Sequence, residues 1–330
     1  MMKKINELND IESISTFYRG MAMGYGKQKN VLFISEENGS IVDKIPFQRN
    51  LLEIMEDKLF LSNTDLYVYD EELQDFILYR KSLEGGRVNL FNGNFIENKY
   101  TRSSESVQVT MYNGKSDVKL WEKIYSDRIS WFCRGNHLYV TDLMHEYIDF
   151  IDARTGGVLN TLHFENPPIS RFIYYYKDTL IVSLEIKPLE EYRLLGLDAR
   201  TGEEKWSIED ARYLYVQDLE KGYLYGIGGN LFQVIDVKNG KILVYERLSS
   251  EIEKYKVFPA RKGCLSPNGL YFYSNSADCK FGLINLHTHK IEFVVDLNFS
   301  NGVKITDLSY HNGRLYILDT DKTLHIFAEE

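Results

Sequence analysis

The residues of this chain best suited to chemistry are seven cations that recur along its length. Each precedes, by 8 to 12 residues, an apolar residue that anchors a strand-like segment. Arginine binds carboxylate and phosphate through paired hydrogen bonds, so several arginines at one place would capture an anion or an acidic protein segment. Their alternative role is to pair with acids of neighbouring segments or to be solvated. The seven residues are Arg49, Arg87, Arg128, Arg171, Arg212, Arg261 and Lys304.

Three tyrosines form a second candidate set near two of these cations. Tyr174 and Tyr176 are two residues apart and would share one side of a strand, and Tyr213 directly follows Arg212. On an exposed face these rings would contact a ligand, such as a sugar or a side chain of a partner protein. Their alternative role is packing within and between sheets.

Histidine and cysteine give no catalytic or metal signature. His287 and His289 have a metal-like spacing, but His289 occupies a turn position that other segments fill with glycine. The three cysteines are scattered without a CxxC pair, and no nucleophile, dinucleotide or zinc motif occurs in a suitable context. We therefore expect no catalytic residue, no metal site and no cofactor.

The elements that would position the candidate side chains recur with a regular period. A Leu-Tyr phrase followed by apolar residues begins at Leu138, and its copies follow in steps of 42, 44, 46 and 45 residues. A period in this range, built from short strands, is typical of a β-propeller. An aromatic content of 14% also favours strands. The copies begin at Leu180 (a diverged copy), Leu224, Leu270 and Leu315.

A second recurring element is a turn of the form Asp-x-x-x-Gly. It ends an apolar strand at Asp152, Asp198 and Asp236, and glycine follows four residues later each time. The Asp side chain can accept hydrogen bonds from turn amides, and glycine adopts the positive φ that closes the hairpin. Because these aspartates recur with the fold, we assign them a structural rather than a catalytic role.

The repeats predict an all-β fold, a single propeller of four-stranded blades. We expect seven blades, with eight as the alternative if the first hairpin stands alone. The last repeat ends one strand early, so the N- and C-terminal strands would share a blade and close the ring without an open edge. We expect residues 1–16 to be an N-terminal extension, 17–330 the propeller, and 97–106 an exposed loop. The seven cations would surround the channel mouth on one face.

Three segments carry a family resemblance. Residues 198–206 read Asp-Ala-Arg-Thr-Gly and then Lys-Trp, Trp121 is a similar outer-strand tryptophan, and residues 138–142 read Leu-Tyr-Val-Thr-Asp. They resemble quinoprotein-type (PQQ-like) and YVTN-like propeller repeats over roughly residues 55–330. The chain lacks the adjacent cysteine pair against which quinoprotein dehydrogenases hold their cofactor. The resemblance therefore implies a cytosolic, bacterial-style propeller without quinone, a kind of protein that often acts as an interaction platform.

Composition limits the remaining functions. The 330 residues carry 48 acids against 39 Lys plus Arg, a net charge of −9, which disfavours generic binding to nucleic acid. Because no apolar leader and no 18-residue apolar segment occurs, we expect a cytoplasmic protein that does not enter a membrane. We expect a monomeric, non-enzymatic scaffold whose Arg-rich mouth on one face meets an acidic segment of a protein partner. The alternatives are a lyase or hydrolase with its site in the central funnel, and a sensor of an anionic small molecule or sugar.

Overall fold

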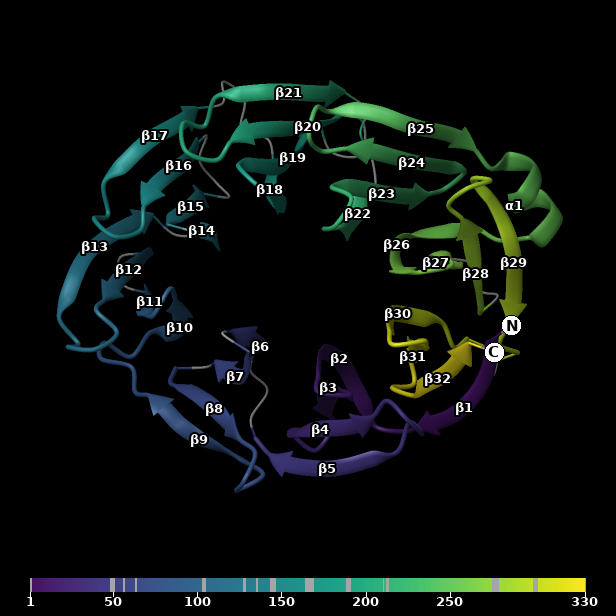
Figure 1. Ribbon diagram of the computed structural model, residues 1–330, viewed down its shortest axis with the longest axis horizontal. Helices are drawn as coiled ribbons and strands as arrows, with labels where there is room; N and C mark the ends of the chain where they lie inside the picture. Colours follow the sequence, from purple (N-terminus) through teal and green to yellow (C-terminus); the bar gives the residue numbers. More distant parts are fainter. Residues whose placement is uncertain are drawn as a thin grey trace. The chain divides into compact units, whose positions relative to one another are not determined.

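The chain folds into eight four-stranded antiparallel sheets and one short helix (Figure 1). It is therefore an all-β propeller of eight blades, the alternative to the seven that we preferred. The computed structural model describes residues 2–47, 51–55, 57–62, 64–102, 105–126, 129–134, 136–142, 147–163, 169–187, 191–209, 211, 214–274, 279–298 and 302–329.

Two compact units divide the chain, and each is described by itself. Unit 2 comprises residues 50–211 and 237–240 and contains blades 2 to 5. Blade 2 consists of β6 (Leu51–Met55), β7 (Lys58–Ser62), β8 (Leu66–Asp70) and β9 (Asp75–Arg80). Blade 3 consists of β10 (Arg87–Phe91), β11 (Asn94–Thr101), β12 (Ser106–Tyr112) and β13 (Lys119–Ser126). Blade 4 consists of β14 (Ile129–Arg134), β15 (His137–Asp142), β16 (Tyr147–Asp152) and β17 (Val158–His163), and blade 5 of β18 (Ile169–Tyr176), β19 (Thr179–Lys187), β20 (Glu191–Asp198) and β21 (Glu204–Glu209).

Unit 1 comprises residues 1–49, 212–236 and 241–330 and contains blades 1, 6, 7 and 8. Blade 1 consists of β2 (Ile11–Tyr18), β3 (Met21–Gly26), β4 (Asn30–Ser35) and β5 (Ile41–Pro46). Blade 6 consists of β22 (Leu214–Asp218), β23 (Tyr223–Gly228), β24 (Leu231–Asp236) and β25 (Lys241–Arg247), and helix α1 (Ser249–Tyr255) follows it. Blade 7 consists of β26 (Pro259–Ser266), β27 (Gly269–Ser274), β28 (Lys280–Asn285) and β29 (Lys290–Asp296), and blade 8 of β30 (Ile305–His311), β31 (Arg314–Asp319), β32 (Leu324–Glu329) and β1 (Met2–Leu8).

The first strand of the chain completes the last blade. In β1 and β32, Met2 lies opposite Glu329 and Leu8 opposite Leu324 (Figure 1). The prediction that the terminal strands share a blade is therefore confirmed. Residues 2–8 and 11–16, which we expected to form an extension, lie instead in strands of blades 8 and 1. Their sequence hides this role because β1 is a polar strand at the edge of its sheet, where side chains need not be apolar.

The repeated leucines form the cores of the blades. Each of the five, Leu138, Leu180, Leu224, Leu270 and Leu315, begins or nearly begins the second strand of its blade and is 0% exposed. In four of the five copies the next residue is a tyrosine, and all four tyrosines are also buried. The Leu-Tyr phrase therefore recurs because the second strand of each of these blades is covered on both faces.

The Asp-x-x-x-Gly turns have the geometry that their sequence predicts. The Oδ1 atom of Asp152 accepts hydrogen bonds from the N–H groups of Arg154 at 2.8 Å and Thr155 at 3.1 Å, and Gly156 has a φ of 71°. In blade 7, Asn285 replaces the aspartate and His289 takes the glycine position with a φ of 57°. His289 is therefore a turn residue, which accounts for its spacing from His287.

Within the described residues, no helix is long and apolar enough to cross a membrane.

Candidate functional site

Two of the seven predicted cations have side chains that the structure describes. Arg87 begins β10 of blade 3, and Lys304 lies directly before β30 of blade 8; both are exposed, and they belong to different compact units. The Arg-rich mouth therefore stays a prediction. The side chains of the other five cations lie outside the described part of the chain: Arg49, Arg128, Arg171, Arg212 and Arg261.

Arg87 interacts with polar residues of the preceding blade. Its Nε atom donates a hydrogen bond to the hydroxyl of Ser62 at 3.4 Å, and that hydroxyl donates to the carbonyl oxygen of Val88 at 2.6 Å. Burial raises the pKa of Glu53 on β6, and the positive charge of Arg87 lowers it in part. Arg87 thus interacts with an acid of a neighbouring blade, which is the alternative role that we considered for the series.

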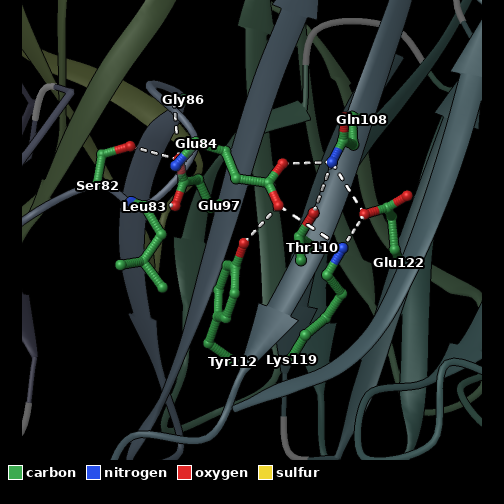
Figure 2. A network of polar contacts seen from close by, with 10 residues as sticks. All are labelled: Ser82, Leu83, Glu84, Gly86, Glu97, Gln108, Thr110, Tyr112, Lys119 and Glu122. Carbon is green, nitrogen blue, oxygen red and sulfur yellow. Dashed lines mark hydrogen bonds and ion pairs between the residues drawn. The ribbon is translucent and has the colours of Figure 1, made fainter. Parts of the chain in front are cut away.

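The loop before Arg87 is held by a buried carboxylate (Figure 2). Glu97 on β11 is 3% exposed and accepts hydrogen bonds from the backbone N–H groups of Leu83 at 3.1 Å and of Glu84 and Gly86, both at 2.9 Å. The hydroxyl of Ser82 also donates to it. This arrangement corrects the expectation of an exposed loop at residues 97–106, because β11 continues to Thr101 and its polar Glu97 is an internal anchor.

A second carboxylate, that of Glu84, extends from the same loop over blade 3 (Figure 2). It accepts hydrogen bonds from the hydroxyl of Tyr112 at 2.7 Å and from Gln108, and the ammonium of Lys119 lies 3.7 Å away. Burial, together with the hydrogen bond to Glu84, raises the pKa of Tyr112, so the phenol stays a donor. These contacts tie the loop to the blade and give it a fixed conformation. The sequence offered only the Gly85-Gly86 pair as a turn signal.

Of the three tyrosines that the sequence predicts as contact residues, Tyr176 is the one whose side chain the structure describes. It lies at the last position of β18. The ammonium groups of Lys177 and Lys238 lie 5.5 Å and 5.9 Å from the centre of its ring, within the range of cation–π contacts. This half-buried ring is therefore already engaged by two cations of the chain. The side chain of Tyr174 and the whole of Tyr213 lie outside the described residues, so their predicted role is untested.

A pocket of about 400 Å³ lies among blades 6, 7 and 8 of unit 1. Its walls include Tyr271 and Phe293 of blade 7 and the carboxylates of Glu292 and Glu329. We call it the Glu329 pocket. Sequence reasoning missed it because its residues come from three repeats and no local motif joins them. No group of three or more His, Cys, Asp or Glu in the described part of the chain is placed to hold a metal ion.

Large apolar side chains are exposed along three successive blades of unit 2. They lie on β9, β13 and β17 or within two residues before them, and each of these is the last strand and an edge of its sheet (Figure 1). Their exposed fractions range from 39% to 68%, whereas β21, the equivalent strand of blade 5, exposes no large apolar side chain. We call this set the apolar rim: Leu73, Ile77, Leu78, Val118, Leu120, Ile124, Val158 and Leu159.

Comparisons with known proteins show the fold alone. No family model and no curated protein sequence matches the chain. It is similar in structure to the computationally designed Ika8 protein (TM-score 0.69, 10% identity, 99% of this chain and 98% of that one). It is also similar to BamB from Moraxella catarrhalis (0.58, 12%, all of both chains) and Sqt1 from Saccharomyces cerevisiae (0.62, 10%, 100% and 97%). All three are β-propellers. The resemblance to PQQ-like and YVTN-like repeats stays a prediction.

Proposed function

We propose that this protein is a non-enzymatic scaffold that binds a protein partner through the apolar rim of unit 2. The observation that supports this is the exposure of eight large apolar side chains on the edge strands of three successive blades or within two residues before them. Single exposed hydrophobic residues are normal on protein surfaces, but several on the same edge strand, repeated in three successive blades, carry a cost in water and are a feature of interaction sites.

The occupant that fits this rim is an extended segment of the partner. Within the described residues β9 pairs only with β8, so its other side offers backbone N–H and C=O groups to an added strand. Ile77 and Leu78 are adjacent and 39% and 54% exposed, so they present apolar groups on both faces of that strand. Backbone pairing would supply affinity, and pockets beside these side chains would supply specificity.

A charged substitution on β9 tests the proposal. The tagged full chain is used to isolate its partner from its own cells, alongside Leu78→Lys and the control Val42→Lys. Val42 is 60% exposed and lies on β5, the corresponding strand of blade 1. Lysine on an edge strand opposes strand addition, so we expect Leu78→Lys to weaken binding by about tenfold or more. Val42→Lys should bind as the wild type does.

Hydrogen exchange of the purified complex locates the contact. Amides of β9 should exchange more slowly in the complex than in the free protein if a strand is added there. Equal recovery of the partner by both lysine variants, with no protection of β9, would exclude the rim. Loss of the partner in Arg87→Ala alone would instead favour the Arg-rich mouth that the sequence predicts.

A further inference from the structure

The Glu329 pocket has the composition of a binding site for an organic cation. From its chemistry we propose that it binds a small molecule carrying an alkylammonium or alkylguanidinium group. This inference is independent of the apolar rim, which lies in the other compact unit. Four features of the pocket carry it: a fixed carboxylate, a second carboxylate, an aromatic wall and a suitable volume.

The fixed carboxylate is that of Glu329, at the end of β32. Its Oε1 accepts a hydrogen bond from the hydroxyl of Tyr271 at 2.8 Å, and its Oε2 accepts one from the hydroxyl of Tyr310 at 2.7 Å. Burial and the bond to Glu329 raise the pKa of both phenols, so they remain neutral donors. They orient the carboxylate without cancelling its charge, and each oxygen keeps a lone pair for a ligand.

A second carboxylate lines the same pocket. The Oε2 of Glu292 accepts a hydrogen bond from Asn285 at 3.2 Å. Among the described residues, neither Glu292 nor Glu329 has an ion-pair partner. Lys221 also lines the pocket, but its ammonium lies 3.4 Å from the carboxylate of Asp218. The net local charge is therefore negative, which repels anionic ligands and attracts cations.

The aromatic wall suits the apolar stem of such a ligand. Tyr271 is 1% exposed, and its ring is stacked against Tyr310 at 5.8 Å with an interplanar angle of 24°. Phe293 meets Tyr271 edge-on at 6.4 Å, and the thioether of Met2 is 3.3 Å from the hydroxyl of Tyr271. Tyr271 therefore lies behind the pocket surface, and the half-buried ring of Phe293 is the aromatic surface that can attract a cation or pack against methylene groups.

The size of the pocket indicates a small molecule. A volume of about 400 Å³ lies within the range of about 300–1,000 Å³ that is usual for small-ligand sites. The pocket also combines an apolar wall with a few converging polar groups, which is the usual composition of such sites. A small amine with a carbon stem satisfies both parts, whereas the two carboxylates repel a phosphate or carboxylate ligand whatever stem it carries.

A titration of the full chain with matched probes tests the proposal. n-Butylammonium and n-butylguanidinium are compared with butyrate and n-butanol, and binding is followed through the methyl resonance of Met2, assigned with Met2→Leu. We expect both cations to shift this resonance with a Kd of about 1 mM or tighter. Butyrate and butanol should leave it unchanged. No shift with either cation, or an equal shift with butyrate, would overturn the proposal.

Two glutamine variants establish which charge is responsible. Glu329→Gln removes the charge and keeps an acceptor oxygen for one of the two tyrosines, while its NH₂ group can donate to the hydroxyl oxygen of the other. We therefore expect cation affinity to fall by about tenfold or more. The control Glu246→Gln, an exposed position on β25, should bind normally. Wild-type affinity in folded Glu329→Gln would overturn the proposal; if that variant is unfolded, Glu292→Gln and the probe series on the wild type decide.

One further probe separates a small molecule from a protein side chain. Acetyl-Gly-Lys-Gly-amide presents the same ammonium on a peptide. Weaker or absent binding of this peptide supports a free small amine as the ligand. Binding of the peptide without binding of n-butylammonium would overturn the small-molecule assignment.

Discussion

The indole ring of Trp121 lies directly against Gly156 of the next blade. A Cβ atom at Gly156 would be only 2.6 Å from Cγ of Trp121, a distance that real Cβ atoms do not adopt. The indole Nε1–H also donates a hydrogen bond to the carbonyl oxygen of Ala153 at 2.8 Å. The last strand of blade 3 thus holds the Asp-x-x-x-Gly turn of blade 4.

The same contact recurs two blades later. Trp206 donates a hydrogen bond from Nε1 to the carbonyl oxygen of Val237 at 3.1 Å, and a Cβ at Gly240 would lie 2.6 Å from its Cδ2. The tryptophan and the turn glycine therefore recur together because each blade packs on the turn of its successor. Glycine is required at this turn position for two reasons: its positive φ and the close approach of the indole ring.

Gly156→Ala should destabilise the protein more than Gly93→Ala. Both glycines have positive φ, 71° and 70°, so alanine at either adds backbone strain of about 1–2 kcal/mol. Gly93 has open space where the Cβ would lie, whereas Gly156 faces Trp121, which adds about 1–3 kcal/mol of overpacking. Urea unfolding of both variants measures the difference. Equal losses would mean that the indole moves aside without cost.

Truncation of the repeated leucines tests the blade cores. Leu224→Ala and Leu270→Ala should each lower the free energy of unfolding by about 2–5 kcal/mol, because both side chains are 0% exposed. Leu243→Ala, at a position 41% exposed on β25, should change it by less than about 0.5 kcal/mol. Wild-type melting of the two core variants would contradict the assignment of these leucines to the second strands.

Removal of the last strand should affect the protein more than removal of the first. β32 pairs with both β31 and β1, so deletion of residues 323–330 leaves β1 without its partner and opens the edge of β31. Deletion of residues 2–8 removes only the edge strand of blade 8. We expect the first variant to aggregate or unfold and the second to stay folded with lower stability. Light scattering after gel filtration distinguishes them, and a stable monomer of the first would refute the pairing.

The sequence predicts the parts of the fold that repeat and misses those that occur once. Buried second strands favour large apolar residues such as leucine and tyrosine, and tight turns favour aspartate and glycine, so these positions carry the period. The edge strand β1 and the first strand of blade 1 carry no such requirement, which is why the blade count was one too low. The expectation of a loop from Glu97 onward is wrong because a buried carboxylate inside a strand is rare unless donors such as loop amides bind it. The Glu329 pocket depends on contacts between repeats, which spacing within one repeat cannot reveal.

At low pH, aspartate at position 152 should no longer make the protein more stable than asparagine does. Burial by itself would raise the pKa of Asp152, but hydrogen bonds from the N–H groups of Thr155 and Arg154 outweigh it, and the pKa is lowered. A depressed folded-state pKa gives stability above the unfolded value of about 3.9, which is lost as pH falls through the folded value. Asp152→Asn keeps the turn, as Asn285 does in blade 7. We expect Asp152→Asn to lower the free energy of unfolding by about 0.5–1 kcal/mol at pH 7, allowing for solvent screening. The loss should become smaller toward pH 2. Urea unfolding across this pH range would contradict the assignment if the difference stayed constant.

Glu97→Gln should release the loop of residues 81–86. A carboxylate offers acceptors on both oxygens, whereas glutamine presents one oxygen and an NH₂ group that would face the loop's N–H donors. Each buried N–H left without an acceptor costs about 1–3 kcal/mol, so we expect Glu97→Gln to lower the free energy of unfolding by about 2–4 kcal/mol. Lys81 is exposed at the start of this loop, so trypsin cleavage there reports its release.

Glu122→Gln is the matched control for this variant. Glu122 lies in the same blade and joins the same polar network, but its side chain is 32% exposed. Among the described residues it binds Gln108 and Lys119 and no other side chain or backbone group. Exposed pairs of this kind contribute about 0–1 kcal/mol, so this variant should keep its loop protected from trypsin. If both variants lost equal stability, or if Glu97→Gln resisted cleavage at Lys81, the loop would owe its conformation to the Glu84 contacts alone. Greater lability in Glu97→Gln would assign that role to the buried carboxylate, which accepts hydrogen bonds from backbone N–H groups on both sides of the loop's Gly85.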